Sequence, residues 1–127
     1  MTDSAGNTYR AAVPTVRGSG ISQAIYYASG IKGAAAGANT VTVVFNTATP
    51  YVDLRALEYR GLDPVDPFDV GASGKGWGRS ARSAAVSTTA SNELVFAAGM
   101  TTGGFTSAGS GFTSRIITAP DGDIAQD

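Results

Sequence analysis

The feature that most constrains the fold of this chain is the regular interruption of its apolar runs by turn-forming residues. Short runs rich in Val, Ile, Thr, Tyr and Phe recur about every ten residues, separated by clusters of Gly, Pro, Asn, Asp and Ser. No segment keeps a helical period over three turns. This rhythm predicts an all-β protein, specifically an antiparallel β-sandwich of the jelly-roll or immunoglobulin-like type.

The composition favours the same fold class. The 127 residues include 17 glycines and only 15% charged residues, whereas 43% are hydrophobic. Small residues suit short strands joined by tight turns, and a helical bundle would need far more Glu, Lys, Leu and Arg. The length predicts a single domain over residues 1–127, with enough apolar residues to fill a core.

Several segments carry the strand pattern. The clearest is 39–46, in which Val41, Val43 and Phe45 alternate with threonines, so that one face is expected to be buried and the other wet. The segment 94–100 is apolar on both faces, as in a central strand that is covered on both sides. The other predicted strands are 8–13, 21–29, 51–59, 82–89 (on a sheet edge) and 112–118.

The chain contains neither cysteine nor histidine, and this absence excludes several kinds of site. It cannot form a disulfide, a Ser-His-Asp triad, a cysteine nucleophile or an ordinary His/Cys zinc site. Acid–base catalysis would have to use carboxylates, tyrosines or one of the two lysines. The net charge is −1 and the nine basic residues are scattered along the sequence, so nucleic acid is not an expected partner. The sequence shows no signal peptide and no apolar run long enough for membrane insertion.

Both ends of the sequence fall beside turn signals. The chain begins close to a turn at 3–7 and stops at 122–127, where a further strand is expected to start. This predicts an internal fragment of a larger module, with open sheet edges that pair with another chain. We therefore expect a homodimer or another homo-oligomer held through these edges.

Four stretches, taken in order, carry a resemblance to a known kind of module. They are 2–9 (TDSAGNTY), 22–28 (SQAIYYA), 57–63 (LEYRGLD) and 112–127. Together they resemble an uncharacterised β-sandwich module of large secreted or surface proteins of soil bacteria, whose members carry further strands before and after this region. The resemblance implies a secreted or cell-surface location and a role in adhesion or carbohydrate contact. It supplies no catalytic residues.

Glu58 is the strongest candidate for a catalytic residue. In a strand over 51–59 it would share the core face with three aliphatic residues, and burial would raise its pKa as in a general acid or a metal ligand. With Asp53, or one of the two aspartate runs described below, as the partner carboxylate, it would serve a small carboxylate-based hydrolase. The alternative interpretation is a carboxylate at a strand end, paired with Arg60 or Arg115.

The opposite face of the same predicted strand is a candidate ligand-binding surface. It would present Tyr51, Asp53, Arg55 and Tyr59. Rings can stack on the faces of sugars while charged groups bond the sugar hydroxyls, which is how sugar-binding sandwiches use such a surface. The alternative is an ordinary solvent-exposed sheet face with a cross-strand ion pair, which has the same residue composition.

Trp77 is the second candidate for ligand binding. It lies between Lys75 and Arg79 in a glycine-rich loop, where an exposed indole could stack on a sugar or an aromatic ligand. The alternative is an indole that folds back and closes one end of the core.

Two runs of aspartates predict a site for calcium or another divalent cation. These candidate ligands are Asp63, Asp66 and Asp69 in a proline-stiffened loop, and Asp121 and Asp123 near the last residue, Asp127. Neither run matches the D-x-D-x-D-G calcium loop, and Asp-Pro and Asp-Gly are common turn formers, so turn formation is the alternative.

The leading hypothesis from the sequence is a non-catalytic extracellular module that acts in adhesion, scaffolding or carbohydrate contact. It combines the strand rhythm, the Ser/Thr/Gly-rich surface and the absent catalytic residue types. The carboxylate-based hydrolase, with or without a metal, is the alternative.

Overall fold

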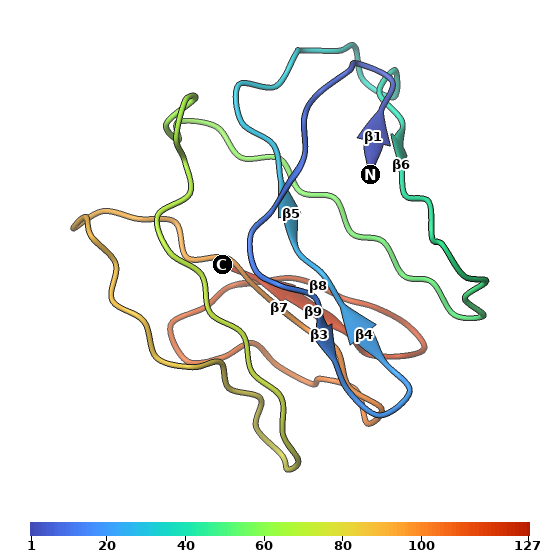
Figure 1. The fold of residues 1–127 in the computed structure, drawn as a ribbon. Helices are drawn as coiled ribbons and strands as arrows, with labels where there is room; N and C mark the ends of the chain where they lie inside the picture. Colours follow the sequence, from blue (N-terminus) through green and yellow to red (C-terminus); the bar gives the residue numbers. More distant parts are fainter. The chain divides into compact units, whose positions relative to one another are not determined.

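The computed structural model describes all residues from 1 to 127 and contains strands but no helix (Figure 1). Nine short strands form four small antiparallel sheets. The prediction of an all-β, antiparallel fold is therefore confirmed. The structure contains no helix with the length and apolar character that a membrane span needs.

Backbone contacts divide the chain into two compact units. The first comprises residues 1–12 and 26–68, and the second comprises residues 13–25 and 69–127. Each unit combines segments from separate parts of the sequence, so each depends on contacts between residues that are far apart along the chain.

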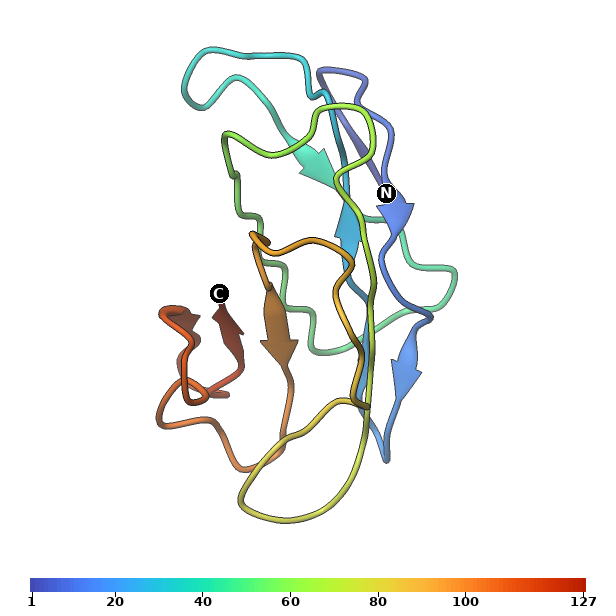
Figure 2. The same ribbon diagram turned by 90° about the vertical axis from the view of Figure 1, so that its left-hand side faces the viewer.

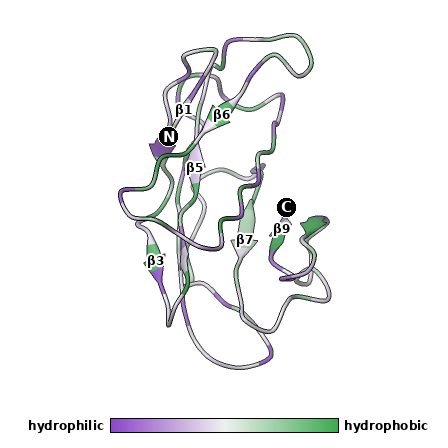
Figure 3. Ribbon diagram, turned by 90° about the vertical axis from the view of Figure 1, so that its right-hand side faces the viewer, coloured by the Kyte–Doolittle hydropathy of each residue, from purple (hydrophilic) through white to green (hydrophobic).

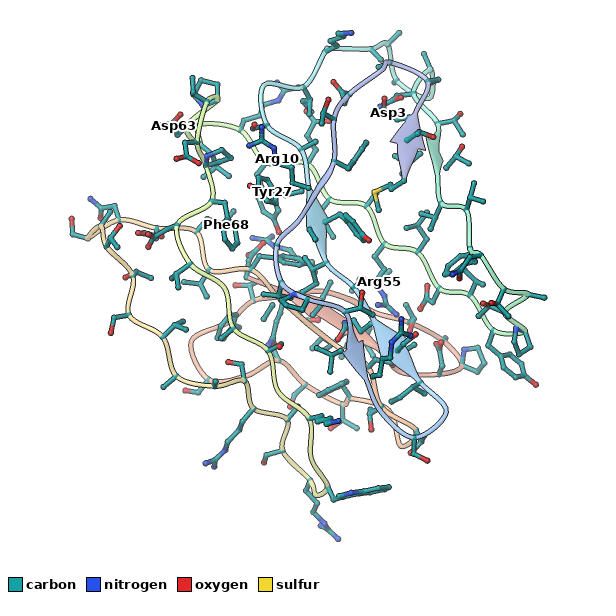
Figure 4. All side chains as sticks on the ribbon, in the orientation of Figure 1. Asp3, Arg10, Tyr27, Arg55, Asp63 and Phe68 are labelled. Atoms are coloured by element: carbon teal, nitrogen blue, oxygen red, sulfur yellow. The ribbon has the colours of Figure 1, made fainter.

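The first unit contains two sheets of two strands each. The pairs are β1 (Thr2–Asp3) with β6 (Val41–Thr42) and β2 (Arg10–Ala11) with β5 (Tyr26–Tyr27). The ring of Tyr27 stacks on that of Phe68, with the centroids 5.3 Å apart and the planes inclined by 15° (Figure 4). Because stacked rings bury large apolar surfaces, this contact fixes the end of the segment 51–68 against β5.

Asp3 organises the turn that follows β1. Its carboxylate accepts hydrogen bonds from the backbone N–H of Asn7 (2.9 Å), Nδ2 of Asn7 (2.7 Å), the hydroxyl of Tyr9 (2.9 Å) and Nδ2 of Asn39 (3.1 Å). These donors, the backbone N–H of Asn7 first, hold the pKa of Asp3 well below its usual range. Burial, together with the bond to this carboxylate, raises the pKa of Tyr9. Gly6 closes the turn at φ 73°, where a side chain would be strained.

We expect this network to make the first unit lose stability in acid. An unfolded aspartate titrates near pH 3.9 and the pKa of folded Asp3 is lower. The stabilisation by its carboxylate is therefore complete above about pH 4 and is lost as the pH falls through the folded-state pKa. Urea unfolding between about pH 2 and pH 7, followed by the amide NMR signals of residues 3–9, should show this decline. The variant Asp3→Asn should make the decline shallower.

The matched control for this experiment is Asp66→Asn in the same unit. The carboxylate of Asp66 is exposed and accepts no hydrogen bond, so its removal should leave the acid profile unchanged. An equally steep decline in Asp3→Asn and in the unaltered chain would contradict the prediction.

The second unit begins with a β-hairpin. Strand β3 (Val16–Arg17) pairs with β4 (Ser22–Gln23), and Arg17 lies opposite Ser22. The turn between them is closed by a hydrogen bond from Gly18 N to Ile21 O (2.8 Å). This hairpin forms one wall of the groove described below.

A three-stranded sheet forms the C-terminal part of the second unit. Its order is β7 (Ala97–Gly99), β9 (Ile124–Gln126) and β8 (Ser114–Ile117), and β9 runs antiparallel to both neighbours (Figure 2). Asp123, Ile124 and Ala125 are fully buried, and β7 and β9 carry the hydrophobic colours of Figure 3. The interpretation that the chain stops where a further strand should start is wrong, because 124–126 form β9, the central strand of this sheet.

Three predictions about strands are wrong. The segment 94–100 provides the edge strand β7 rather than a central strand, because β9 has partners on both sides and β7 on only one. The segments 51–59 and 82–89 form no strand. An alternating pattern becomes a strand only when a neighbouring strand accepts and donates its backbone hydrogen bonds, and these two segments pair with none. The predicted strands 8–13, 39–46 and 112–118 are present but shorter, and 21–29 is divided into β4 and β5, which pair with different strands.

Candidate functional site

An open groove lies in the second unit, between β3 and the loop that follows residue 72. Its volume is about 250 Å³, and its lining residues are Pro14, Thr15, Val16, Arg17, Ser73, Gly74 and Lys75. Its polar lining consists of hydroxyl and basic side chains, with no carboxylate.

The backbone of the loop 73–84 shapes one side of this groove. A hydrogen bond from Ala84 N to Ser73 O (3.2 Å) closes the loop, which projects as the narrow yellow-green finger in Figure 1. Gly74 lies directly against the backbone oxygen of Arg82, where a side chain would collide. Nζ of Lys75 donates to the backbone oxygen of Arg17 (3.3 Å), which ties the loop to β3.

Trp77 lies within this loop, two residues beyond the groove. It is 95% exposed, the most exposed of the large hydrophobic residues. The interpretation of Trp77 as an indole that folds back and closes one end of the core is therefore wrong, and the indole is exposed, as expected of a ligand-binding residue. An indole held in water by a closed loop is available to stack on a ligand.

Four basic residues belong to the groove or to the loop, two in the lining of the groove and two further along the loop. They are Arg17, Lys75, Arg79 and Arg82. None of them forms an ion pair with a carboxylate, and the segment 70–92 contains no Asp or Glu. The positive potential of this region is therefore not compensated by neighbouring carboxylates.

The arrangement offers three kinds of contact to a ligand. The indole supplies a flat apolar surface, the hydroxyls of Thr15 and Ser73 can donate and accept hydrogen bonds, and the basic groups donate charged ones. No known protein family, curated protein or solved structure matches this chain. The function is therefore inferred from the chemistry of the groove itself.

Glu58 is exposed and does not lie on a core face. Its side chain is 62% exposed, and Oε1 lies 3.7 Å from Nε of Arg60, whose side chain is 93% exposed. The expectation of a partly buried Glu58 is wrong, because the segment 51–59 forms no strand and so has no core face. The alternative of a pair with Arg60 is confirmed, and the hydrolase hypothesis loses the buried acid on which it depended.

The predicted binding face over 51–59 is not one continuous face. Tyr51 is 90% exposed, whereas Tyr59 is half-buried. Asp53 and Arg55 form an ion pair with each other, and their side chains are mostly covered. Of this set, Tyr51 alone presents a fully exposed ring.

The aspartates 63 and 69 serve as acceptors for backbone groups. Oδ1 of Asp63 accepts from Val65 N (2.8 Å) and Asp66 N (3.1 Å), and these donors lower the pKa of Asp63. The carboxylate of Asp69 accepts hydrogen bonds from the backbone N–H of Thr89 (2.7 Å) and from the Thr89 hydroxyl (2.8 Å). The backbone bond first, and then the hydroxyl bond, lowers the pKa of Asp69. Both arrangements favour the turn-forming alternative over a cation site.

The second aspartate run behaves in the same way. Oδ1 of Asp121 accepts from the hydroxyl of Thr118 (2.7 Å). Oδ1 of buried Asp123 accepts from the backbone N–H of Thr101 (3.1 Å). These bonds shape the turn that leads into β9, and calcium binding by either run stays a prediction.

Sequence reasoning did not find Thr15, Arg17 or Ser73 as site residues. Arg17 and Lys75 are 58 positions apart, and only the docking of the loop on β3 brings them together. No local pattern marks such a contact, although the unbroken absence of carboxylates from 70 to 92 was a visible signal.

Proposed function

We propose that this chain is a non-catalytic, extracellular binding module that contacts carbohydrate through the groove and Trp77. The observation that carries the proposal is the 95% exposed indole in a loop that also lines a polar groove. Aromatic rings stack on the apolar faces of sugar rings, while hydroxyl and basic groups bond the sugar hydroxyls. The resemblance to secreted bacterial modules supports the extracellular location.

The chemistry of the groove favours binding over catalysis. None of its lining residues is a carboxylate or a tyrosine, so Lys75 is its only side chain that could act as a base. The ammonium group of Lys75 is hydrogen-bonded to the backbone of β3 (3.3 Å), which suits a positioned cation. A ligand bound in the groove would contact hydrogen-bond donors rather than a general base.

A glycan array followed by calorimetry tests this proposal. The full chain should bind at least one class of polysaccharide, and the bound ligand should be displaced by soluble fragments of the same polysaccharide. Failure to bind any glycan on an array that includes neutral, carboxylated and sulfated polysaccharides would overturn the proposal.

We further propose that the small sheets belong to an antiparallel sandwich that a second copy completes. The outer edges of β7 and β8 have no strand partner, and several apolar side chains of the first unit are exposed, among them Val44, Phe45 and Val52.

We therefore expect light scattering to give a mass of at least twice 12.8 kDa at high protein concentration. Phe45→Lys, which places a charge on the exposed apolar surface, should shift the equilibrium toward the monomer. Trp77→Ala is the control, because it removes another exposed aromatic side chain from a loop assigned to ligand binding. A mass of one chain at all concentrations would contradict the prediction.

A further inference from the structure

We infer that the groove and the loop 73–84 bind an acidic polysaccharide, whose sugars carry carboxylate or sulfate groups. The inference rests on the proposed carbohydrate-binding function and specifies the class of ligand. It is carried by three features of this region. The groove is lined by two basic residues and no acidic one, the loop carries two further arginines, and its indole is exposed. None of the four basic residues pairs with a carboxylate.

The distribution of basic residues over the chain points to a bound anion. Of the nine Lys and Arg residues, the arginines at 55, 60 and 115 pair with carboxylates. Four others, at positions 17, 75, 79 and 82, lie on β3 or in the loop that docks on it. Like charges gathered without counterions repel one another, and a bound anion removes that repulsion.

The donors of the groove suit carboxylate or sulfate groups. The ammonium of Lys75 has three N–H donors, and its bond to the backbone oxygen of Arg17 uses one of them. Arg17 also lines the groove and is exposed, and the planar fork of its guanidinium matches the two oxygens of a carboxylate. Trp77, two residues further along, can stack on the sugar ring that carries the acidic group.

Two other anionic partners fit the loop less well. Proteins that bind single-stranded nucleic acid stack successive bases on several aromatic rings, and Trp77 is the only aromatic residue between 69 and 95. Insertion into a lipid surface would need several large apolar side chains beside the indole. The remaining residues of the loop 74–83 are glycine, serine and alanine apart from its basic residues.

Two pairs of probes test the inference by calorimetry on the full chain. The first pair is the hexamer of galacturonic acid and its methyl ester, and the second is dextran sulfate and dextran. At least one acidic probe should bind about tenfold or more tightly than its neutral counterpart, since each charged contact is retained only with the acid. Raising the salt concentration to about 0.5 M should weaken that binding, because exposed charges are screened.

Variants of the loop distinguish the effect of its charge on binding from an effect on folding. The double variant Arg79→Gln with Arg82→Gln should weaken binding of the acidic probe by about fivefold or more and leave binding of the neutral probe unchanged. Arg10→Gln is the matched control, since Arg10 is an exposed arginine of the first unit that pairs with no carboxylate. It should leave binding unchanged.

The possible failures are distinguishable. Equal affinity for an acidic probe and its neutral counterpart would overturn the acidic ligand class and leave carbohydrate binding standing. Absence of binding to every glycan would overturn both proposals. Tighter binding to a ten-residue oligothymidylate or to phosphatidylglycerol vesicles than to any glycan would also overturn both, in favour of that other anion.

Discussion

Replacing Gly122 by alanine is expected to lower the free energy of unfolding by about 3 kcal/mol, because backbone strain and a backbone clash combine at this position. Gly122 has φ 71°, which costs an L-residue roughly 1–2 kcal/mol. Its added Cβ would also lie 2.6 Å from Cα of Gly104, a backbone atom that cannot rotate away. Gly122 N donates to Thr118 O (2.8 Å) and its carbonyl accepts from Phe105 N (2.6 Å), so relief of the clash would break bonds that lead into β9.

Urea unfolding followed by far-ultraviolet circular dichroism measures this loss. The control is Gly111→Ala, because Gly111 has a similar φ of 84° but no atom lies near its added Cβ. It should cost only about 1 kcal/mol, the penalty of the backbone conformation alone. Equal losses in the two variants would show that the contact with Gly104 contributes nothing.

The all-β class and its turns could be predicted from the sequence because turn chemistry is local. Gly6 and Gly122 both adopt a positive φ, and both lie in turns that their Asp-containing surroundings indicate. The hairpin turn closed by Gly18 likewise lies in a predicted cluster of glycine and serine. These features depend on neighbours within about four residues, which a sequence displays directly.

The choice of which apolar runs become strands could not be predicted in the same way. The alternation of 51–59 resembles that of 39–46, yet only the latter contributes a strand, β6, because β1 lies beside it. The central strand β9 spans only Ile124–Gln126 and carries no strong pattern. It becomes the central strand because it pairs with β8, about ten residues earlier in the chain, and with β7, about twenty-seven residues earlier. Because this pairing is non-local, the alternation of apolar and polar residues shows which segments could form strands but not which of them do.

The residues of the candidate site could likewise be predicted where the signal is local, and could not where it depends on distant contacts. Trp77 and its basic neighbours could be found because a lone tryptophan in a glycine-rich loop is visible locally. Glu58 was misplaced because its burial was deduced from a strand that does not form. Arg17 could not be found, since its meeting with Lys75 depends on the hairpin and the loop folding against each other.

Trp77→Ala is expected to weaken carbohydrate binding by roughly 10- to 100-fold, which corresponds to the 1–3 kcal/mol typical of a stacked ring. The same change should alter the free energy of unfolding by less than about 0.5 kcal/mol, because the side chain is 95% exposed and packs on little. Calorimetry with the glycan selected on the array measures the first effect, and urea unfolding measures the second. Tyr51→Ala is the matched control: Tyr51 is a ring of similar exposure (90%) in the first unit, outside the groove. If Tyr51→Ala lost binding and Trp77→Ala kept it, the ligand surface would lie on the segment 51–59, and the groove would have no part in recognition.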